Sequence, residues 1–178
     1  MNHRAHRVAG VCTGTIAATY VYQETFGTVS SWNVDSFVTL GIVLAGSILG
    51  SLLPDIDHPN SRIGRKLPVV SRVVNKVFGH RGFTHTLLAQ LLLVLSLFML
   101  SGVVPRGITG YYLPFAFGLI VGYASHLLLD MLTVSGIPLL YPFITRPIRL
   151  ARFKTGRDDL IVSLLMVGLT GSYLFLYL

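Results

Sequence analysis

Residues 111–133 read YYLPFAFGLIVGYASHLLLDMLT. This run is long and apolar enough to cross a bilayer as a helix, which takes about 20 such residues. It nevertheless holds His126 and Asp130 near its end. An imidazole and a carboxylate beside a membrane are costly to desolvate unless they bind something. Because the two residues are four apart, they lie on one face of a helix and can bind one ion together.

The whole chain has the composition of an integral membrane protein. Of its 178 residues, 52% are hydrophobic and 12% are charged, and the mean hydropathy is +0.68. An ordinary soluble domain has about 25% charged residues. A chain of this length is expected to form one domain, residues 1–178, whose core must come from helix packing within the bilayer.

Four more apolar runs predict helices. Residues 37–53, 86–104 and 160–178 approach or reach the length that spans a bilayer. Residues 8–22 form a shorter run rich in Gly, Ala and Thr, which suits a tightly packed helix. For that run, a cleaved signal peptide and a re-entrant or interfacial helix are the alternatives. The expected fold class is all-α: a polytopic membrane helical bundle of about five transmembrane helices, the first one short.

Basic residues predict how these helices cross the membrane, because Lys and Arg concentrate in short cytoplasmic loops. They gather at the N-terminus, in the loop 54–85 and in the segment after Thr133. The two intervening loops, 23–36 and 105–110, contain a single basic residue, Arg106. This alternation predicts a multi-pass protein of the cytoplasmic (inner) membrane with its N-terminus in the cytoplasm.

The same topology brings the His and Asp clusters to one face of the membrane, where they can converge. Pro54 and Pro59 break the helix around Asp55 and Asp57, so that the carboxylates can turn back toward the bundle. The single cysteine, Cys12, excludes a multi-thiolate zinc site and leaves nitrogen and oxygen as ligands. The candidate metal ligands are His6, Asp55, Asp57, His58, His80, His85, His126 and Asp130.

Two local predictions concern residues around these clusters. Thr84 is expected to cap the helix of residues 86–104, which would place His85 in its first turn. The positive end of the helix would there favour neutral imidazole, which is free to ligate. Tyr and Trp residues near the ends of the runs, Trp32 and Tyr123 among them, are expected to lie at the membrane interfaces.

Three motifs stand in a characteristic order along the chain: LLPDIDHP at 52–59, GHRGFTHT at 79–86 and GYASHLLLDMLT at 122–133. Together with HRVAG at 6–10, they resemble the YdjM-type inner-membrane proteins, which are described as membrane-bound metal-dependent hydrolases. The resemblance extends from residue 6 to about residue 142 and implies a helical membrane fold with a metal site. More distantly, the ligand types and spacing are similar to the zinc-dependent phospholipase C and P1 nuclease group, whose His-x-x-x-Asp pair is like His126 and Asp130.

The candidate ligands outnumber the four that one tetrahedral zinc ion uses, so we expect two or more divalent ions, zinc first and manganese second. Such a site would hydrolyse a phosphoester or ester, a phospholipid being one candidate substrate beside the surrounding bilayer. Asp57, Arg81 and Asp130 are expected to take part in catalysis, with Arg81 stabilising transition-state charge. The residues expected to hold an anionic head group are Arg62, Arg65 and Lys66.

Other classes of function make different demands on the sequence. A proton- or ion-coupled transporter needs polar groups near the midplane of several helices, but the runs 86–104 and 160–178 contain no charged residue. A non-catalytic scaffold would need a saturated, closed metal site. Nucleic acid is not an expected partner, because the orientation loops explain the net charge of +7 and no stacking aromatics interleave with them.

Overall fold

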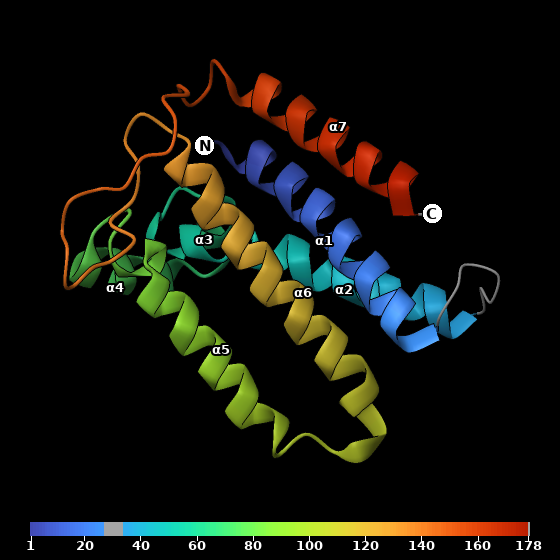
Figure 1. Cartoon of the computed structure of the whole chain (residues 1–178). Coiled ribbons are helices and arrows are strands. Elements are labelled where there is room, and N and C mark those ends of the chain that lie inside the picture. The colour runs from blue at the N-terminus through green and yellow to red at the C-terminus, as the bar shows by residue number, and fades with distance from the viewer. Residues whose placement is uncertain (27–33, 178) are drawn as a thin grey trace.

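The computed structural model describes residues 1–26 and 34–177, and within them it is an all-α bundle without strands (Figure 1). This confirms the predicted fold class. Five long helices form the bundle: α1 (His3–Phe26), α2 (Val34–Gly50), α5 (Leu87–Ser101), α6 (Arg106–Met131) and α7 (Asp159–Tyr177). Helices α1, α2 and α6 pack against one another, while α7 packs on α1 and α5 packs on α6.

Three helical segments in the described part of the chain are long and apolar enough to cross a membrane: Val34–Asp57, Arg106–Met131 and Asp159–Tyr177. Helix α5 is apolar but shorter. Helix α1 is long but less apolar, and it packs against three other helices of the bundle. Five spans with a cytoplasmic N-terminus therefore stay a prediction.

Helices α2 and α6 approach each other closely because glycines line their contact. A Cβ atom on Gly122 would lie 2.0 Å from the backbone oxygen of Ser47, and one on Gly50 would lie 2.1 Å from that of Leu119. Helix α1 joins this pair, since Ser47 Oγ donates a hydrogen bond to Gly10 O at 2.8 Å. Small residues allow such contact inside a bilayer, where close packing rather than the hydrophobic effect drives helix association.

Between α2 and α5 the chain forms four short helices: η2 (Pro54–Asp57), α3 (Arg62–Lys66), α4 (Pro68–Phe78) and η3 (Phe83–His85). The prediction that Thr84 caps α5 is wrong, because Thr86 is the N-cap and accepts a hydrogen bond from Ala89 N. Thr84 instead donates its hydroxyl hydrogen to Asp57 Oδ2 at 2.8 Å. His85 consequently ends η3 and precedes α5.

The interfacial position expected for Tyr123 is also wrong. Its side chain is only 4% exposed, and its hydroxyl donates a hydrogen bond to Thr84 O, so it fastens α6 to η3. Trp32 lies outside the described residues. The segment after α6 folds back over the same end of the bundle, where Leu139 O accepts a hydrogen bond from Leu87 N at the start of α5.

Candidate metal centre

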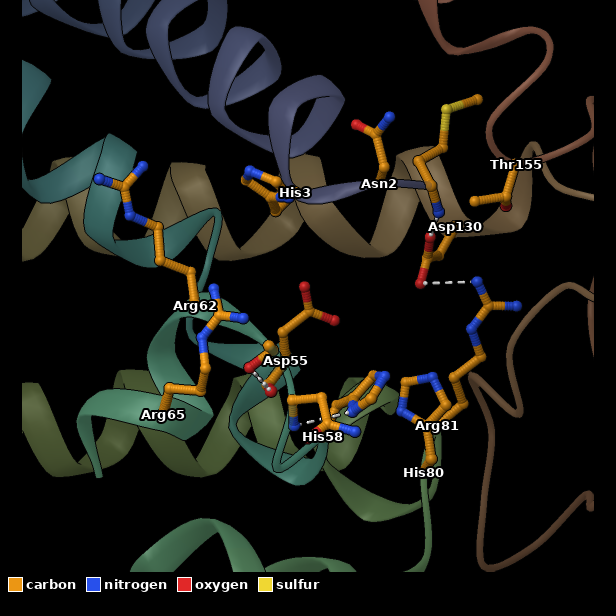
Figure 2. A pocket seen from close by; sticks show the side chains of 13 residues that line it. Asn2, His3, Asp55, His58, Arg62, Arg65, His80, Arg81, Asp130 and Thr155 are labelled. Carbon is orange, nitrogen blue, oxygen red and sulfur yellow. Dashed lines mark hydrogen bonds and ion pairs between the residues drawn. The ribbon is translucent and has the colours of Figure 1, made fainter. Parts of the chain in front are cut away.

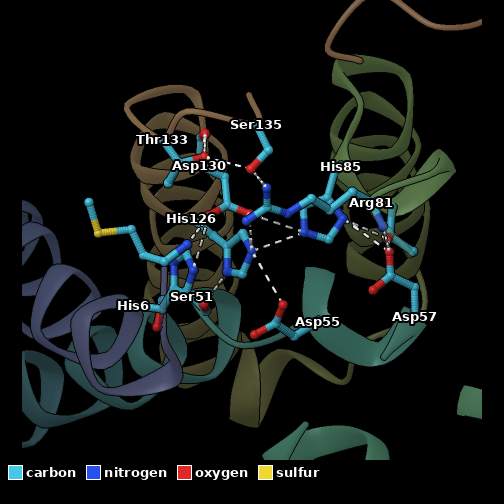
Figure 3. Close-up of polar contacts among 12 residues, drawn as sticks. His6, Ser51, Asp55, Asp57, Arg81, His85, His126, Asp130, Thr133 and Ser135 are labelled. Atoms are coloured by element: carbon cyan, nitrogen blue, oxygen red, sulfur yellow. Dashed lines mark hydrogen bonds and ion pairs between the residues drawn. The ribbon is translucent and has the colours of Figure 1, made fainter. Parts of the chain in front are cut away.

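Four segments bring ionisable side chains to one buried cluster at the end of the bundle where α1 begins and α6 ends (Figure 3). His85 and His126 have no exposed surface, and Asp130 is 2% exposed. The prediction that His126 and Asp130 share a helix face is confirmed, because His126 Nε2 lies 3.7 Å from Asp130 Oδ2. The side chains that meet here are His6 from α1, Asp55 and Asp57 from η2, His85 from η3, and His126 and Asp130 from α6.

Two overlapping groups of three ligands have the spacing for a metal ion. One group is His6, His126 and Asp130, and the other is Asp55, His85 and His126. In each group the ligand atoms all lie within 4.8 Å of one another. Both groups offer two imidazole nitrogens and one carboxylate oxygen, a donor set that suits zinc and neighbouring divalent ions.

Hydrogen bonds fix which ring nitrogen of His85 and His126 is free to ligate. His126 Nδ1 lies 2.7 Å from the backbone oxygen of Ser51, and His85 Nδ1 lies 3.1 Å from Asp57 Oδ2. Each partner accepts hydrogen bonds only, so each neutral ring carries its hydrogen on Nδ1. The two Nε2 lone pairs then face each other at 3.2 Å, an arrangement that a bound cation stabilises.

The ring nitrogens of His6 give the most direct evidence that the cluster suits a metal ion. Both of its ring nitrogens are buried and neither has a hydrogen-bond partner, although Nε2 lies 3.3 Å from Asp130 Oδ1. Its ring stacks on that of His126 with centroids 3.7 Å apart. A buried polar atom without a partner costs about 1–3 kcal/mol. The residues of the cluster therefore fit a divalent metal ion.

Positive groups already lie against the carboxylate of Asp130. The ammonium group of Met1 contacts Oδ1, and Arg81 Nη2 lies 3.6 Å from Oδ2. Arg81 also donates a hydrogen bond to Ser135, and its backbone has φ 58°, a left-handed conformation that residues other than glycine rarely adopt. The fold thus holds Arg81 in a strained conformation that directs its guanidinium group to the cluster.

Asp57 joins neither three-ligand group, because its carboxylate faces the loop of residues 79–86. Its Oδ2 accepts hydrogen bonds from Arg81 N and Thr84 Oγ1, both at 2.8 Å, and its Oδ1 lies 3.1 Å from His80 Nδ1. That hydrogen bond raises the pKa of His80 above its ordinary value. Asp57 is placed to orient His85 and His80 rather than to join the two central ligand groups.

His58 and His80 lie at the rim of the cluster, with ring centroids 4.7 Å apart. His58 Nδ1 accepts a hydrogen bond from Asn60 N, and the His80 side chain is about half exposed. Neither residue belongs to a three-ligand group. Of the eight predicted ligands, the structure therefore brings five into the two central groups and places three around them.

A cavity of about 390 Å³ opens onto the cluster (Figure 2). Asp55 and Asp130 reach it from the buried side, so the ligand groups are accessible from outside the protein. Arg62, Arg65 and Arg81 line the cavity, whereas Lys66, the third residue predicted to hold an anionic substrate, does not. An accessible centre of this kind differs from the closed coordination shell of a structural metal.

Sequence reasoning missed three residues that position side chains of the site. Ser51 contributes only its backbone oxygen, which no side-chain pattern can reveal. Thr84 is predicted to cap α5, whereas it holds Asp57, although it lies inside the motif at 79–86. Ser135 follows the last motif and contacts Arg81. The motif at 79–86 was the one signal that could have found Thr84.

Comparisons with known proteins agree with the motifs. The family of the YdjM inner membrane protein matches residues 1–177. The uncharacterized protein YvsG of Bacillus subtilis (strain 168) is 37% identical over 174 residues, which cover 96% of this chain and 90% of that protein. The inner membrane protein YdjM of Escherichia coli (strain K12) is 44% identical over 102 residues, 56% of this chain and 49% of that protein. No solved structure matches the chain.

Proposed function

The chain belongs to the YdjM family of inner-membrane proteins, and from the site that it builds we propose that it is a membrane-embedded, metal-dependent hydrolase of phosphoester or ester substrates. The observation that carries the proposal is the pair of three-ligand groups, buried except for the partly exposed Asp55, beside an arginine-lined cavity. The buried ring nitrogens of His6, which have no hydrogen-bond partner, favour a metal, and an accessible cavity favours a reaction at that metal over a purely structural role.

The ligand distances support two ions, with zinc as the first candidate and manganese as the second. Asp130 Oδ1 lies 3.3 Å from His6 Nε2, whereas Oδ2 lies 3.5 Å from His85 Nε2. Because the Nε2 lone pair of His126 can serve one ion only, we assign it with His6 and Asp130 Oδ1 to the first. Asp55 and His85 would then hold the second, with Asp130 Oδ2 3.5 Å from His85 Nε2.

Bound divalent ions would supply an activated water at neutral pH and a positive charge for the oxyanion. The protein's own residues provide the rest. Arg81 lies at the cavity beside Asp130, where its guanidinium group can stabilise negative charge on an ester or phosphoester. Asp57 holds His85 by its Nδ1 and contributes by positioning. Arg62 and Arg65 are placed to bind an anionic head group at the mouth.

Metal content and hydrolysis, measured on the same preparations, test the proposal. We expect the protein purified in detergent without chelator to hold about two zinc or manganese ions per chain. His126→Ala and Asp130→Ala should lose metal, and their hydrolysis of p-nitrophenyl phosphodiesters, phosphomonoesters or esters should fall at least about 100-fold. His58→Ala is the matched control, because His58 belongs to neither three-ligand group.

Two results would overturn the proposal. If both variants keep their full metal content, His126 and Asp130 are not ligands. If the wild-type chain holds no metal above background after reconstitution, the hydrolase mechanism fails. Metal without hydrolysis of any of these substrates would favour the scaffold, and a metal flux across proteoliposomes would favour the transporter.

A further inference from the structure

Helix α4 (Pro68–Phe78) turns its polar side toward the protein. Ser71 has no exposed surface, and Asn75 Nδ2 donates a hydrogen bond to the backbone oxygen of Asp57 at 2.7 Å. On a water-soluble protein an amphipathic helix buries its apolar side and exposes its polar side. Helix α4 has the opposite arrangement, because its polar side faces the protein.

The outward side of α4 is apolar. Val69, Val73 and Val77 are 71%, 56% and 64% exposed, and Val70 beside them is exposed as well. We refer to these four residues as the valine face. Helix α4 has 11 residues and is about 16 Å long, so it is too short to cross a bilayer. A short helix with an apolar outer side is suited to lie in the plane of a membrane surface.

Basic residues border the valine face and select the kind of membrane surface that it fits. Arg72 and Lys76 lie on α4 itself, and Arg62, Arg65 and Lys66 precede it on α3. Of the two acidic residues in the segment 54–86, Asp55 faces the ligand cluster and Asp57 is buried against the loop of residues 79–86. The outer surface of this segment is thus positively charged, which favours anionic lipid head groups.

Two neighbouring features favour a position of the valine face beside the bilayer. Helix α5, which is apolar, begins at Leu87, nine residues after α4 ends at Phe78. The segment after α6 reaches the start of α5 through Leu139 and carries Phe143, which is 88% exposed. A second copy of the chain is a poor occupant, because four valine side chains offer far less than the roughly 800 Å² that each partner of a stable interface buries.

We propose that α4 is an interfacial helix whose valine face docks in the boundary between head groups and acyl chains of an anionic leaflet. Arg72 and Lys76 contact the head groups, while Asn75 ties the docked helix to the backbone of Asp57. The bilayer surface therefore supports the loop that carries Asp57, and the mouth of the cavity opens at head-group depth. This inference rests on the exposure and charge of α4 and does not require hydrolysis.

Tryptophan fluorescence in vesicles tests the docking directly. Val73→Trp is made in a Trp32→Phe background, so that it is the one tryptophan of the chain. The protein is reconstituted in phosphatidylcholine and phosphatidylglycerol vesicles that contain phosphatidylcholine brominated at carbons near the head group or deep in the chain. We expect blue-shifted emission and stronger quenching by the shallow bromines than by the deep ones.

Arg72→Trp in the same background marks the head-group edge of α4, and the deep bromines should quench it at most about half as strongly as they quench Val73→Trp. Replacing phosphatidylglycerol by phosphatidylcholine should weaken the quenching of Val73→Trp. Val69→Trp repeats the measurement in case Val73→Trp fails to fold. Red-shifted, unquenched emission at positions 73 and 69 would place α4 in water. Blue-shifted but unquenched emission at these positions would place α4 against another protein surface. Either result overturns the proposal.

Discussion

In the middle of the α2–α6 pair the two backbones touch through glycines, whereas at the end of the same pair buried imidazoles and carboxylates fill the space between them. The middle depends on shape alone, because lipid is as apolar as the helices that it surrounds. The end depends on a set of polar groups that need one another and, in our proposal, a metal. The glycine contact fixes the distance between helices, and that distance in turn decides which ligands can meet.

The largest expected effect on stability comes from disrupting the glycine contact between α2 and α6. In Gly122→Val the new Cβ would lie 2.0 Å from Ser47 O, so α2 and α6 must separate. We expect a loss of about 3 kcal/mol or more of stability, measured as thermal unfolding in detergent, together with loss of bound metal. Gly110→Val in the same helix is the control, because nothing lies within 4 Å of its Cβ. Equal stability of the two variants would contradict the close packing.

The next effect concerns the polar end. Asp57→Asn keeps the shape of the side chain but weakens the hold on His85 Nδ1. Because partners that orient metal ligands typically contribute 10- to 100-fold to affinity, we expect metal to bind that much more weakly. Competition with a chelator of known affinity measures the change, with the exposed Asp35→Asn as the charge-matched control. An unchanged affinity would mean that Asp57 does not position His85.

A smaller effect is expected on substrate binding, where a residue that lines the cavity is compared with one that does not. Arg65 lines the cavity and Lys66 does not. If the proposed hydrolysis is correct, Arg65→Ala should raise KM for an anionic substrate several-fold, about 1 kcal/mol, without an equal change in kcat. Lys66→Ala should leave both constants unchanged. A similar rise in KM for both variants would show that the cavity does not select the anion.

The smallest effect concerns the cost in stability of the left-handed backbone conformation at Arg81. Both Arg81→Gly and Arg81→Ala remove the guanidinium group, but only glycine accepts φ 58° without strain. We therefore expect the glycine variant to be more stable than the alanine variant by about 1 kcal/mol in thermal unfolding. If alanine is as stable as glycine, the left-handed conformation at this position stores no strain.

Apolar runs predicted the helices, and the alternation of basic loops predicted the convergence of His6, His85, His126 and Asp130. Helix periodicity alone placed the last two on one helix face. The capping residue of α5 could not be predicted, since Thr84 and Thr86 are equally good caps until tertiary contacts engage one of them. The residue type of Tyr123 predicts an interfacial position, but the side chain is buried and its hydroxyl donates a hydrogen bond to Thr84 O in η3, 39 residues earlier in the chain.

The role of Asp57 escaped prediction for a related physical reason. In the sequence it is equivalent to Asp55, two residues earlier. Within η2 the two carboxylates point to different partners. Asp55 approaches His126, whereas Asp57 contacts Thr84, His85 and the backbone N of Arg81. Only the path of the chain after Pro54 decides which carboxylate remains available.

The backbone oxygen of Ser51 that holds His126 is available because α2 ends at Gly50. The last carbonyl groups of a helix have no partner within it, so a residue from elsewhere can use them. The number of residues in α2 thus determines the ring tautomer of a histidine 75 positions later in the chain. Inserting one residue into α2 would advance its end by about 1.5 Å and turn it by about 100°, moving that acceptor away from His126. Helix length, which normally follows membrane thickness, here also decides which ring nitrogen of His126 is free to ligate.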